Sequence, residues 1–178
     1  DIDEIIKVLK SDFITQGPVG PLFEQAVANY CGAQFAVATS NATAGLHIAC
    51  LALDLGPDDW LWTSPNTFVA SANCALYCGA QVDFVDIDPI SYTIDPNKVE
   101  KKVKNYRSIG KNVKAIIGID YAGHPCDWKA LREIADKYDL QLVNDNCHAL
   151  GATYLNDKQY AVKYADLVIQ SYHPVKHL

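Results

Sequence analysis

The feature that most constrains the fold of this chain is a regular alternation of two sequence patterns. Short runs rich in apolar and β-branched residues predict strands, and longer segments with apolar residues at helical spacing predict helices. Such alternation is typical of βα units, which form a mostly parallel sheet. Since the runs are apolar and the helical segments amphipathic, we predict an α/β fold, a three-layer α/β/α sandwich. The expected strands are 34–39, 60–63, 82–86, 113–119, 140–143 and 167–169, and the expected helices lie at 2–9, 22–30, 43–53, 67–77, 96–106 and 128–138.

Local signals support several of these boundaries. Gly32 is expected to end the second helix, and Asp127 to cap the helix at 128–138. The sequence Gly-Pro-Asp at 56–58 predicts a turn. The segment 43–53 is almost wholly apolar, so we expect this helix to be buried.

Size, charge and cysteine content narrow the class of protein. The 178 residues, 49% of them hydrophobic, fit one globular domain, and the net charge of −6 argues against nucleic acid as the main partner. No apolar run reaches the roughly 18 residues of a membrane span, so we expect no membrane partner. The six cysteines show neither a C-x-x-C pair nor a zinc-binding spacing. We interpret them as reduced thiols of a cytoplasmic protein with no metal site, the alternatives being a nucleophile or a metal ligand.

Polar and reactive side chains directly follow the expected strands. They occupy the segments 40–43, 64–68, 120–125, 144–148 and 170–176. In an open parallel sheet, ligands bind beyond the carboxyl ends of the strands. A purely structural domain has no reason to repeat this pattern, so we expect a binding site at this edge of the sheet.

Two of these segments suit the non-reacting parts of a ligand. The segment 40–43 opens a helix, where free N–H groups and the helix dipole suit a phosphate, and Thr43 can add its hydroxyl. An ordinary N-cap box is the alternative. Phe68 precedes a helix of small residues, where it can stack on a planar ring or simply pack in the core.

Two later segments carry ionisable groups. Asp145 follows an apolar run, and a carboxylate buried there needs a cationic or N–H partner, unless it caps a helix that starts at Asn146. His148 lies near Asp145 if the backbone turns helically. Lys176 follows the last expected strand through a stiff segment. A lysine held in a pocket can lose its proton and act as an amine nucleophile, whereas a solvated surface lysine is the alternative.

Pyridoxal phosphate (PLP) requires a site with four parts: a phosphate-binding helix N-terminus, an acid, an aromatic ring that stacks on the cofactor and a lysine. The lysine holds the aldehyde as a Schiff base, and the acid keeps the pyridine nitrogen protonated. We therefore predict a PLP-dependent enzyme. The sequence contains no G-x-G-x-x-G or P-loop pattern, which argues against a plain nucleotide-binding module.

The sequence resembles the DegT/StrS family of nucleotide-sugar aminotransferases, which have the aspartate-aminotransferase fold (fold type I). The resemblance runs along essentially all 178 residues. Its last stretch is most similar to the 4-aminotransferases of the pseudaminic acid pathway. The stretches that carry the resemblance are 9–18, 40–47, 64–73, 84–88, 121–125, 145–152 and 171–176.

The resemblance implies a reactive centre. Lys176 matches the family's Schiff-base lysine, and Asp145 matches the acid on the ring nitrogen. His148 matches a position near the ring and its phenolic oxygen. Asn144 and Asn146 differ from the family's usual Glu-Asp-Ala sequence around the acid.

The resemblance also implies how the cofactor is held. Ser171 and Thr43 match phosphate-binding positions, and Ala42 stands where the family usually has Gly. Phe68 matches the aromatic residue that stacks on the pyridine ring.

The family's reaction is a two-stage transamination. By resemblance, L-glutamate gives its amino group to PLP, and a nucleotide-linked keto-deoxysugar takes it, in a homodimer that serves polysaccharide biosynthesis. The alternatives are a truncated fragment without turnover, or another fold type I PLP enzyme such as a lyase or a dehydratase. Dehydratases of the family carry His in place of Lys176.

The expected domain organisation follows from the same resemblance. Residues 1–20 form an arm or helix outside the main sheet, and 21–178 form a PLP-binding large domain that is incomplete at its C-terminus. We expect the small C-terminal domain of family members to be absent from this chain. Because the chain has no Met and stops two residues after Lys176, we expect a longer parent protein.

Overall fold

The computed structural model describes residues 2–176, and the chain divides into two compact units, one through Ala38 and one from Thr39. The first unit contains the helices α1 (Ile2–Leu9), as predicted, and α2 (Val19–Cys31), which begins three residues before the predicted start at residue 22. Helix α2 ends where Gly32 adopts a left-handed conformation with φ of 73°. Glycine suits this position because it has no Cβ to clash with the following carbonyl.

The second unit contains a parallel sheet, which has five strands in the described residues. Every pair of neighbouring strands is parallel, as the sequence predicts. The strand order is β2-β1-β3-β4-β5, so the carboxyl ends of the last three lie side by side. The strands are β1 (Asp59–Thr63), β2 (Gln81–Phe84), β3 (Asn112–Ile119), β4 (Gln141–Asp145) and β5 (Leu167–Ile169).

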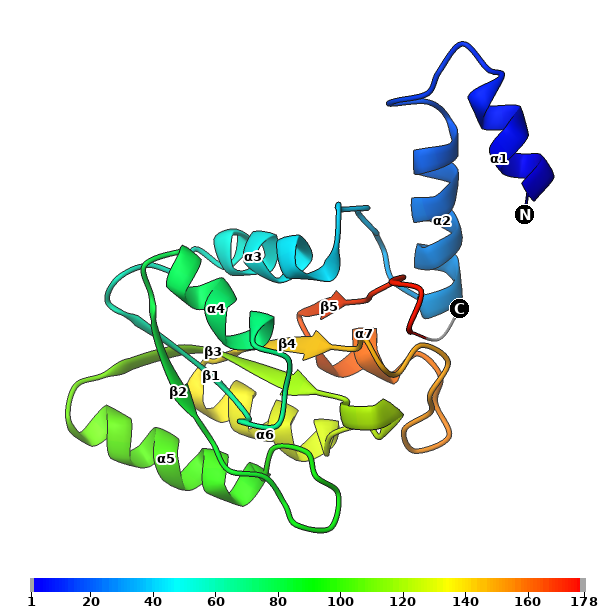
Figure 1. Ribbon diagram of the computed structural model, residues 1–178. Coiled ribbons are helices and arrows are strands. Elements are labelled where there is room, and N and C mark those ends of the chain that lie inside the picture. The colour runs from blue at the N-terminus through cyan, green and yellow to red at the C-terminus, as the bar shows by residue number, and fades with distance from the viewer. Residues whose placement is uncertain (1, 177–178) are drawn as a thin grey trace. The chain divides into compact units, whose positions relative to one another are not determined.

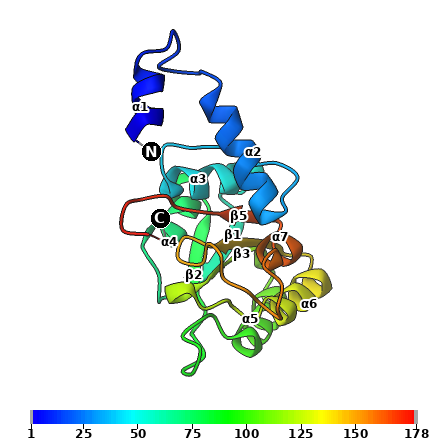
Figure 2. The same cartoon turned by 90° about the vertical axis from the view of Figure 1, so that its right-hand side faces the viewer.

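Helices cover both faces of this sheet, which confirms the predicted three layers. Helices α3 (Ala42–Ala52) and α4 (Ala70–Tyr77) lie on one face (Figure 1). The other face is covered by α5 (Pro96–Ser108), α6 (Trp128–Tyr138) and α7 (Tyr160–Tyr164), and the turned view in Figure 2 shows the same grouping. Each layer packs its own cluster of buried apolar side chains against the sheet.

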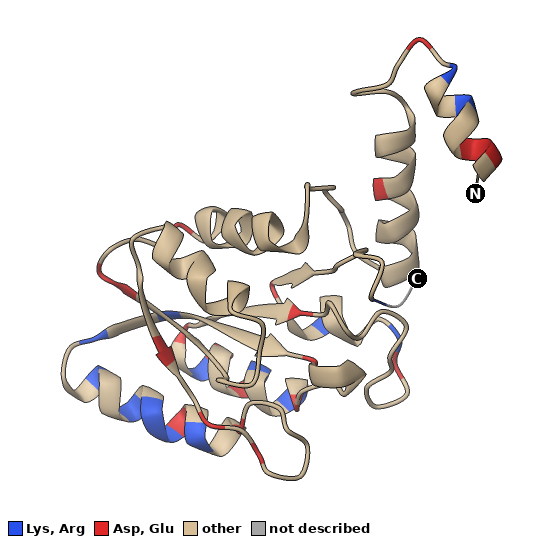
Figure 3. Ribbon diagram, in the orientation of Figure 1, with Lys and Arg blue, Asp and Glu red and all other residues tan. Residues whose placement is uncertain are grey.

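Amphipathic sequence explains the outer layer of α5 and α6. Val99 and Val103 of α5 and Leu131 of α6 are fully buried, while lysines gather on the outside of α5 (Figure 3). Asp127 caps α6 as predicted, and its side chain accepts a hydrogen bond from the backbone N–H of Ala130 at 3.2 Å.

A close contact between Gly118 of β3 and Trp128 fixes the distance between α6 and the sheet. A Cβ on Gly118 would stand 2.7 Å from Cη2 of the Trp128 indole. The indole is fully buried, and its N–H donates to Asp120 at 2.9 Å. Moving the ring would break this hydrogen bond, so only glycine fits at position 118.

The segment 34–39 is not a strand, so this prediction was wrong. None of the strands in the described residues includes it, and Phe35 and Val37 are each 78% exposed. Alternating apolar residues favour a strand only where a neighbouring strand offers hydrogen-bond partners.

Other boundaries shift by a few residues. Helix α4 begins at Ala70 rather than at residue 67, and β2 spans Gln81–Phe84 rather than 82–86. Helix α7 was not predicted, because five residues are too few to show a periodic pattern. A 3-10 turn, η1 (Tyr121–Gly123), follows β3.

Helix α3 is only half buried, although its sequence is almost wholly apolar. Leu46 and Cys50 face the sheet, but Ile48 and Leu51 are about half exposed. Neither α3 nor α4 carries a charged residue (Figure 3), so together they present an apolar outer face. Across residues 2–176, no helix has both the length and the apolar character needed to cross a bilayer.

We predict that Gly118→Ala lowers the free energy of unfolding by about 1–3 kcal/mol, because the new methyl group displaces the Trp128 ring. Urea denaturation followed by tryptophan fluorescence measures this loss. Gly56→Ala is the matched control, since a Cβ at Gly56 meets no atom within 4 Å. Equal stability of the two variants would contradict this account of the contact.

Candidate functional site

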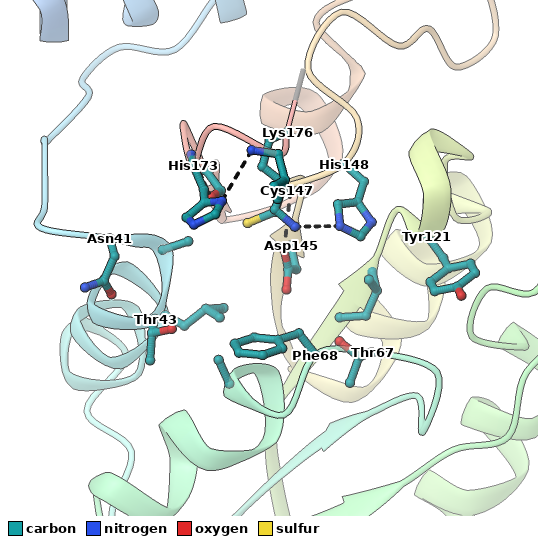
Figure 4. A pocket seen from close by; sticks show the side chains of 16 residues that line it. Asn41, Thr43, Thr67, Phe68, Tyr121, Asp145, Cys147, His148, His173 and Lys176 are labelled. Atoms are coloured by element: carbon teal, nitrogen blue, oxygen red, sulfur yellow. Dashed lines mark hydrogen bonds between the residues drawn. The ribbon is translucent and has the colours of Figure 1, made fainter. Parts of the chain in front are cut away.

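A cavity of about 410 Å³ lies at the carboxyl edge of the sheet (Figure 4). It is formed where α3 and α4 begin and where β3, β4 and β5 end. The predicted binding edge therefore coincides with a cavity, while the roles of the individual residues stay predictions. All seven residues singled out in the sequence line this cavity: Ala42, Thr43, Phe68, Asp145, His148, Ser171 and Lys176.

Asp145 is a buried carboxylate at the end of β4. It is only 7% exposed, and its Oδ2 accepts a hydrogen bond from Ser71 Oγ at 2.8 Å. Its Oδ1 accepts the backbone N–H of Cys147 at 3.3 Å. Residues 146–150 form no helix, so the alternative of a helix-capping aspartate is wrong. The carboxylate is held by neutral donors and borders the cavity.

Lys176 lies opposite His148 across part of the cavity. The Nζ of Lys176 is 2.7 Å from Nε2 of His148, and Figure 4 shows this hydrogen bond. The backbone N–H of Lys176 donates to the carbonyl oxygen of His173 at 2.8 Å, so a tight turn holds the backbone of the lysine. The alternative of a fully solvated lysine is wrong, because the side chain is half-buried and partnered.

The first turn of α3 offers a place for an anion. Asn41 caps the helix, and its side chain accepts the N–H of Ala44 at 2.9 Å. The N–H groups of Ala42 and Thr43 come before the first intrahelical hydrogen bonds, so they remain for a ligand. Ser171 lines the same cavity. The segment can therefore cap the helix and still offer N–H groups to a phosphate.

Phe68 lies just before α4 and borders the cavity with an exposed ring. It is 71% exposed, so the alternative of a core residue is wrong. An aromatic ring that is exposed inside a cavity is available to stack on a planar ligand.

Cys147 also lines the cavity, but its thiol is not activated. Burial and the nearby Asp145 carboxylate both raise the pKa of Cys147 above its usual value. The thiol is therefore protonated at neutral pH and is a poor nucleophile. Among residues 2–176, no group of three or more His, Cys, Asp or Glu side chains gathers closely enough to hold a metal ion.

A second buried carboxylate, Asp120, lies behind the site at the end of β3. Its Oδ1 accepts from the backbone N–H of Cys126 and the indole N–H of Trp128, both at 2.9 Å. Its Oδ2 accepts from Tyr160 Oη at 2.7 Å, and from Asn144 and Asn146. Burial raises the pKa of Asp120, and these hydrogen bonds oppose that rise.

Sequence reasoning missed Ser71 and the network around Asp120. Ser71 and Asp145 are 74 residues apart, and no local pattern connects them. The small residues around Ser71 were the available signal, because small side chains let a helix approach the sheet closely enough for a short hydroxyl to reach a carboxylate.

We predict that Ser71→Ala costs about 1–3 kcal/mol of stability, because it removes a buried hydrogen-bond donor to Asp145. Chemical denaturation measures this cost. Ser108→Ala removes a hydroxyl from an exposed helix end and serves as the control, with a loss of less than about 0.5 kcal/mol. If Ser71→Ala were as stable as this control, the hydrogen bond to Asp145 would contribute nothing to the free energy of unfolding.

The sequence is similar to those of known proteins. The model of the DegT/DnrJ/EryC1/StrS aminotransferase family matches residues 1–178. A UDP-4-amino-4,6-dideoxy-N-acetyl-beta-L-altrosamine transaminase of Campylobacter jejuni is 38% identical over 176 residues, which are 99% of this chain and 45% of that protein. An uncharacterised protein of Methanocaldococcus jannaschii is 41% identical over 89% of this chain and 39% of its own length. The chain spans less than half the length of these curated relatives.

Solved structures share the fold. NtdA from Bacillus subtilis, with bound cofactor PMP, superposes with a TM-score of 0.84 and 31% identity, over 98% of this chain and 38% of that one. Spr1654 of Streptococcus pneumoniae, a proposed sugar aminotransferase in its PLP form, gives a TM-score of 0.88 and 28% identity, over 98% and 46%. The predicted fold type I class is thereby confirmed for the part of the fold that this chain covers.

Proposed function

This chain belongs to the DegT/DnrJ/EryC1/StrS aminotransferase family, and from that premise we propose that it forms the PLP-binding part of a sugar aminotransferase. The proposed reaction transfers an amino group from an amino acid, L-glutamate, to a nucleotide-linked keto-deoxysugar. The observation that carries this proposal is that Lys176 and the buried acid Asp145 line one cavity with a helix N-terminus and an exposed aromatic ring.

The residues around the cavity fit PLP in chemical type. The N–H groups of Ala42 and Thr43 suit its phosphate, Phe68 its flat ring, and Asp145 its ring nitrogen. Ala42 in place of the family's glycine does not close the cavity, because it is one of the residues that line it. When bound, PLP supplies an aldehyde that binds amines and a ring that accepts electrons.

We assign Lys176 two tasks in the reaction. Its amine would hold the cofactor, and the amine, once free, would act as the base that takes the proton from the α-carbon of the amino donor. His148 is placed to share that proton, because its Nε2 lies 2.7 Å from Nζ of Lys176.

Asp145 holds a proton on the ring nitrogen in this proposal. Its negative charge favours the protonated ring. The hydrogen bond from Ser71 orients its Oδ2, and the backbone N–H of Cys147 orients its Oδ1. Both carboxylate oxygens therefore have a defined place before any ligand arrives, which lowers the cost of organising the site.

The proposed substrate class rests on relatives. The Campylobacter jejuni relative carries a UDP-linked sugar in its name, and it covers 99% of this chain. This chain spans 45% of that relative. The complete reaction is therefore a proposal for the whole protein. The product, an amino sugar, suits polysaccharide biosynthesis.

We further propose a homodimer in the cytoplasm. The uncharged outer face of α3 and α4, with Leu51, Leu76 and Tyr77 each more than half exposed, favours burial against another protein surface. Cys50, Cys74 and Cys126 are buried cysteines that form no disulfide bond, which suits a reducing compartment.

Incubation with PLP and reduction with borohydride should place the label on Lys176, because its amine lines the cavity that fits the cofactor. Peptide mass spectrometry after digestion locates the label. Lys176→Ala should lose it, and Lys129→Ala, which changes an exposed lysine on α6, should keep it. Labelling spread over surface lysines in the unsubstituted chain would overturn the proposed site.

Asp145→Asn should lower amination of a nucleotide ketosugar by about 100-fold or more, because a neutral amide cannot favour the protonated ring. Single-turnover assays of the whole protein measure this rate. Asp58→Asn, at an exposed turn, is the control and should retain activity. Activity of Asp145→Asn close to that of the control would show that Asp145 has another role.

A further inference from the structure

Two buried asparagines flank Asp145 and share one partner. Asn144 and Asn146 each donate from Nδ2 to Oδ2 of Asp120, at 3.1 and 3.0 Å. Both are less than 4% exposed. Because successive side chains of a strand point to opposite faces, these two lie on the α6 and α7 side, while Asp145 faces the cavity.

The two asparagines differ in what else they contact. Asn146 also reaches the segment after β5: its Oδ1 accepts from Nε2 of Gln170 at 3.4 Å, and its backbone N–H donates to the carbonyl of Ile169 at 2.9 Å. The Oδ1 of Asn144 has no hydrogen-bond partner within the part of the chain that the structure describes. The side chain of Asn146 therefore ties the end of β4 to the segment that leads to Lys176, and the side chain of Asn144 does not.

Asp120 sets the direction of this connection. Its carboxylate accepts hydrogen bonds, so the amide of Asn146 turns its NH₂ toward Asp120 and its oxygen toward Gln170. Gln170 then presents its Oε1 to the hydroxyl of Tyr172, which donates at 2.6 Å. A chain of hydrogen bonds thus runs from a fixed, buried acceptor into the segment 170–172, four residues before the lysine.

We propose that Asn146 is a positioning residue that holds Lys176 in place relative to Asp145. This inference rests on the function proposed above. Asn146 does not line the cavity, so it acts through the two segments that it joins. One of them carries the acid and the other the amine, and a site that needs both requires a fixed distance between them.

The matched pair Asn146→Ala and Asn144→Ala tests this role. Each variant loses its buried hydrogen bond to Asp120, and Asn146→Ala also loses those to Tyr160 and Gln170, so we expect both to lower the unfolding temperature, Asn146→Ala by more. Titration with PLP, followed by the absorbance of the lysine-linked cofactor, should show about tenfold weaker binding for Asn146→Ala and a change within about twofold for Asn144→Ala.

A variant at the other end of the connection keeps the test possible if Asn146→Ala does not fold. Gln170→Ala should weaken PLP binding to a similar degree, and Gln141→Ala, at the half-buried start of β4, is its control. If Asn146→Ala and Gln170→Ala both fold, the double variant Asn146→Ala/Gln170→Ala should bind PLP no more weakly than either single variant.

The outcomes separate this inference from the proposed function. Equal PLP affinity of Asn146→Ala and Asn144→Ala, or of Gln170→Ala and Gln141→Ala, would overturn the positioning role while leaving PLP binding intact. If the unsubstituted chain took up no PLP at Lys176, the proposed function itself would be overturned, and the inference with it.

Discussion

The hydrogen-bonded ladder of β3, β4 and β5 is the constraint on which the rest of the site depends. Its register sets Ile119 beside Asp145, and Asp145 beside Ile169. Because the three strands are parallel and end at one edge, the segments that follow them leave the sheet together. Residues that are distant in sequence, such as Asp145 and Lys176, therefore border one cavity without any local motif that joins them.

The two faces of this ladder separate two buried carboxylates. Asp145 faces α4 and accepts from Ser71, whereas Asp120 faces α6 and α7 and accepts from Trp128 and Tyr160. These hydrogen bonds come from neutral groups, which compensate only in part for the loss of water around a charge. Burying such groups costs stability, and their concentration behind and beside one cavity is the pattern of a site that serves function rather than stability.

Much of the architecture was predictable, because it depends on periodicity. Apolar runs and helical spacing gave the order of the elements, and the rule for strand ends identified the edge where all seven predicted residues lie. The failures are tertiary in origin. The segment 34–39 has the alternation of a strand but no strand partner in the described residues, and α3 is apolar on a face that the sheet does not cover. The contacts of Ser71 and Asn146 depend on how close two segments pack, which no spacing in the sequence encodes.

A crystal structure of this chain with PLP would test the central claim most directly, namely that one cavity joins an amine, an acid and an anion site. The account predicts electron density that is continuous from Nζ of Lys176 to the cofactor, with the ring nitrogen at Asp145 and the phosphate at the start of α3. A cofactor bound to another lysine, or turned with its phosphate toward Asp145, would contradict it.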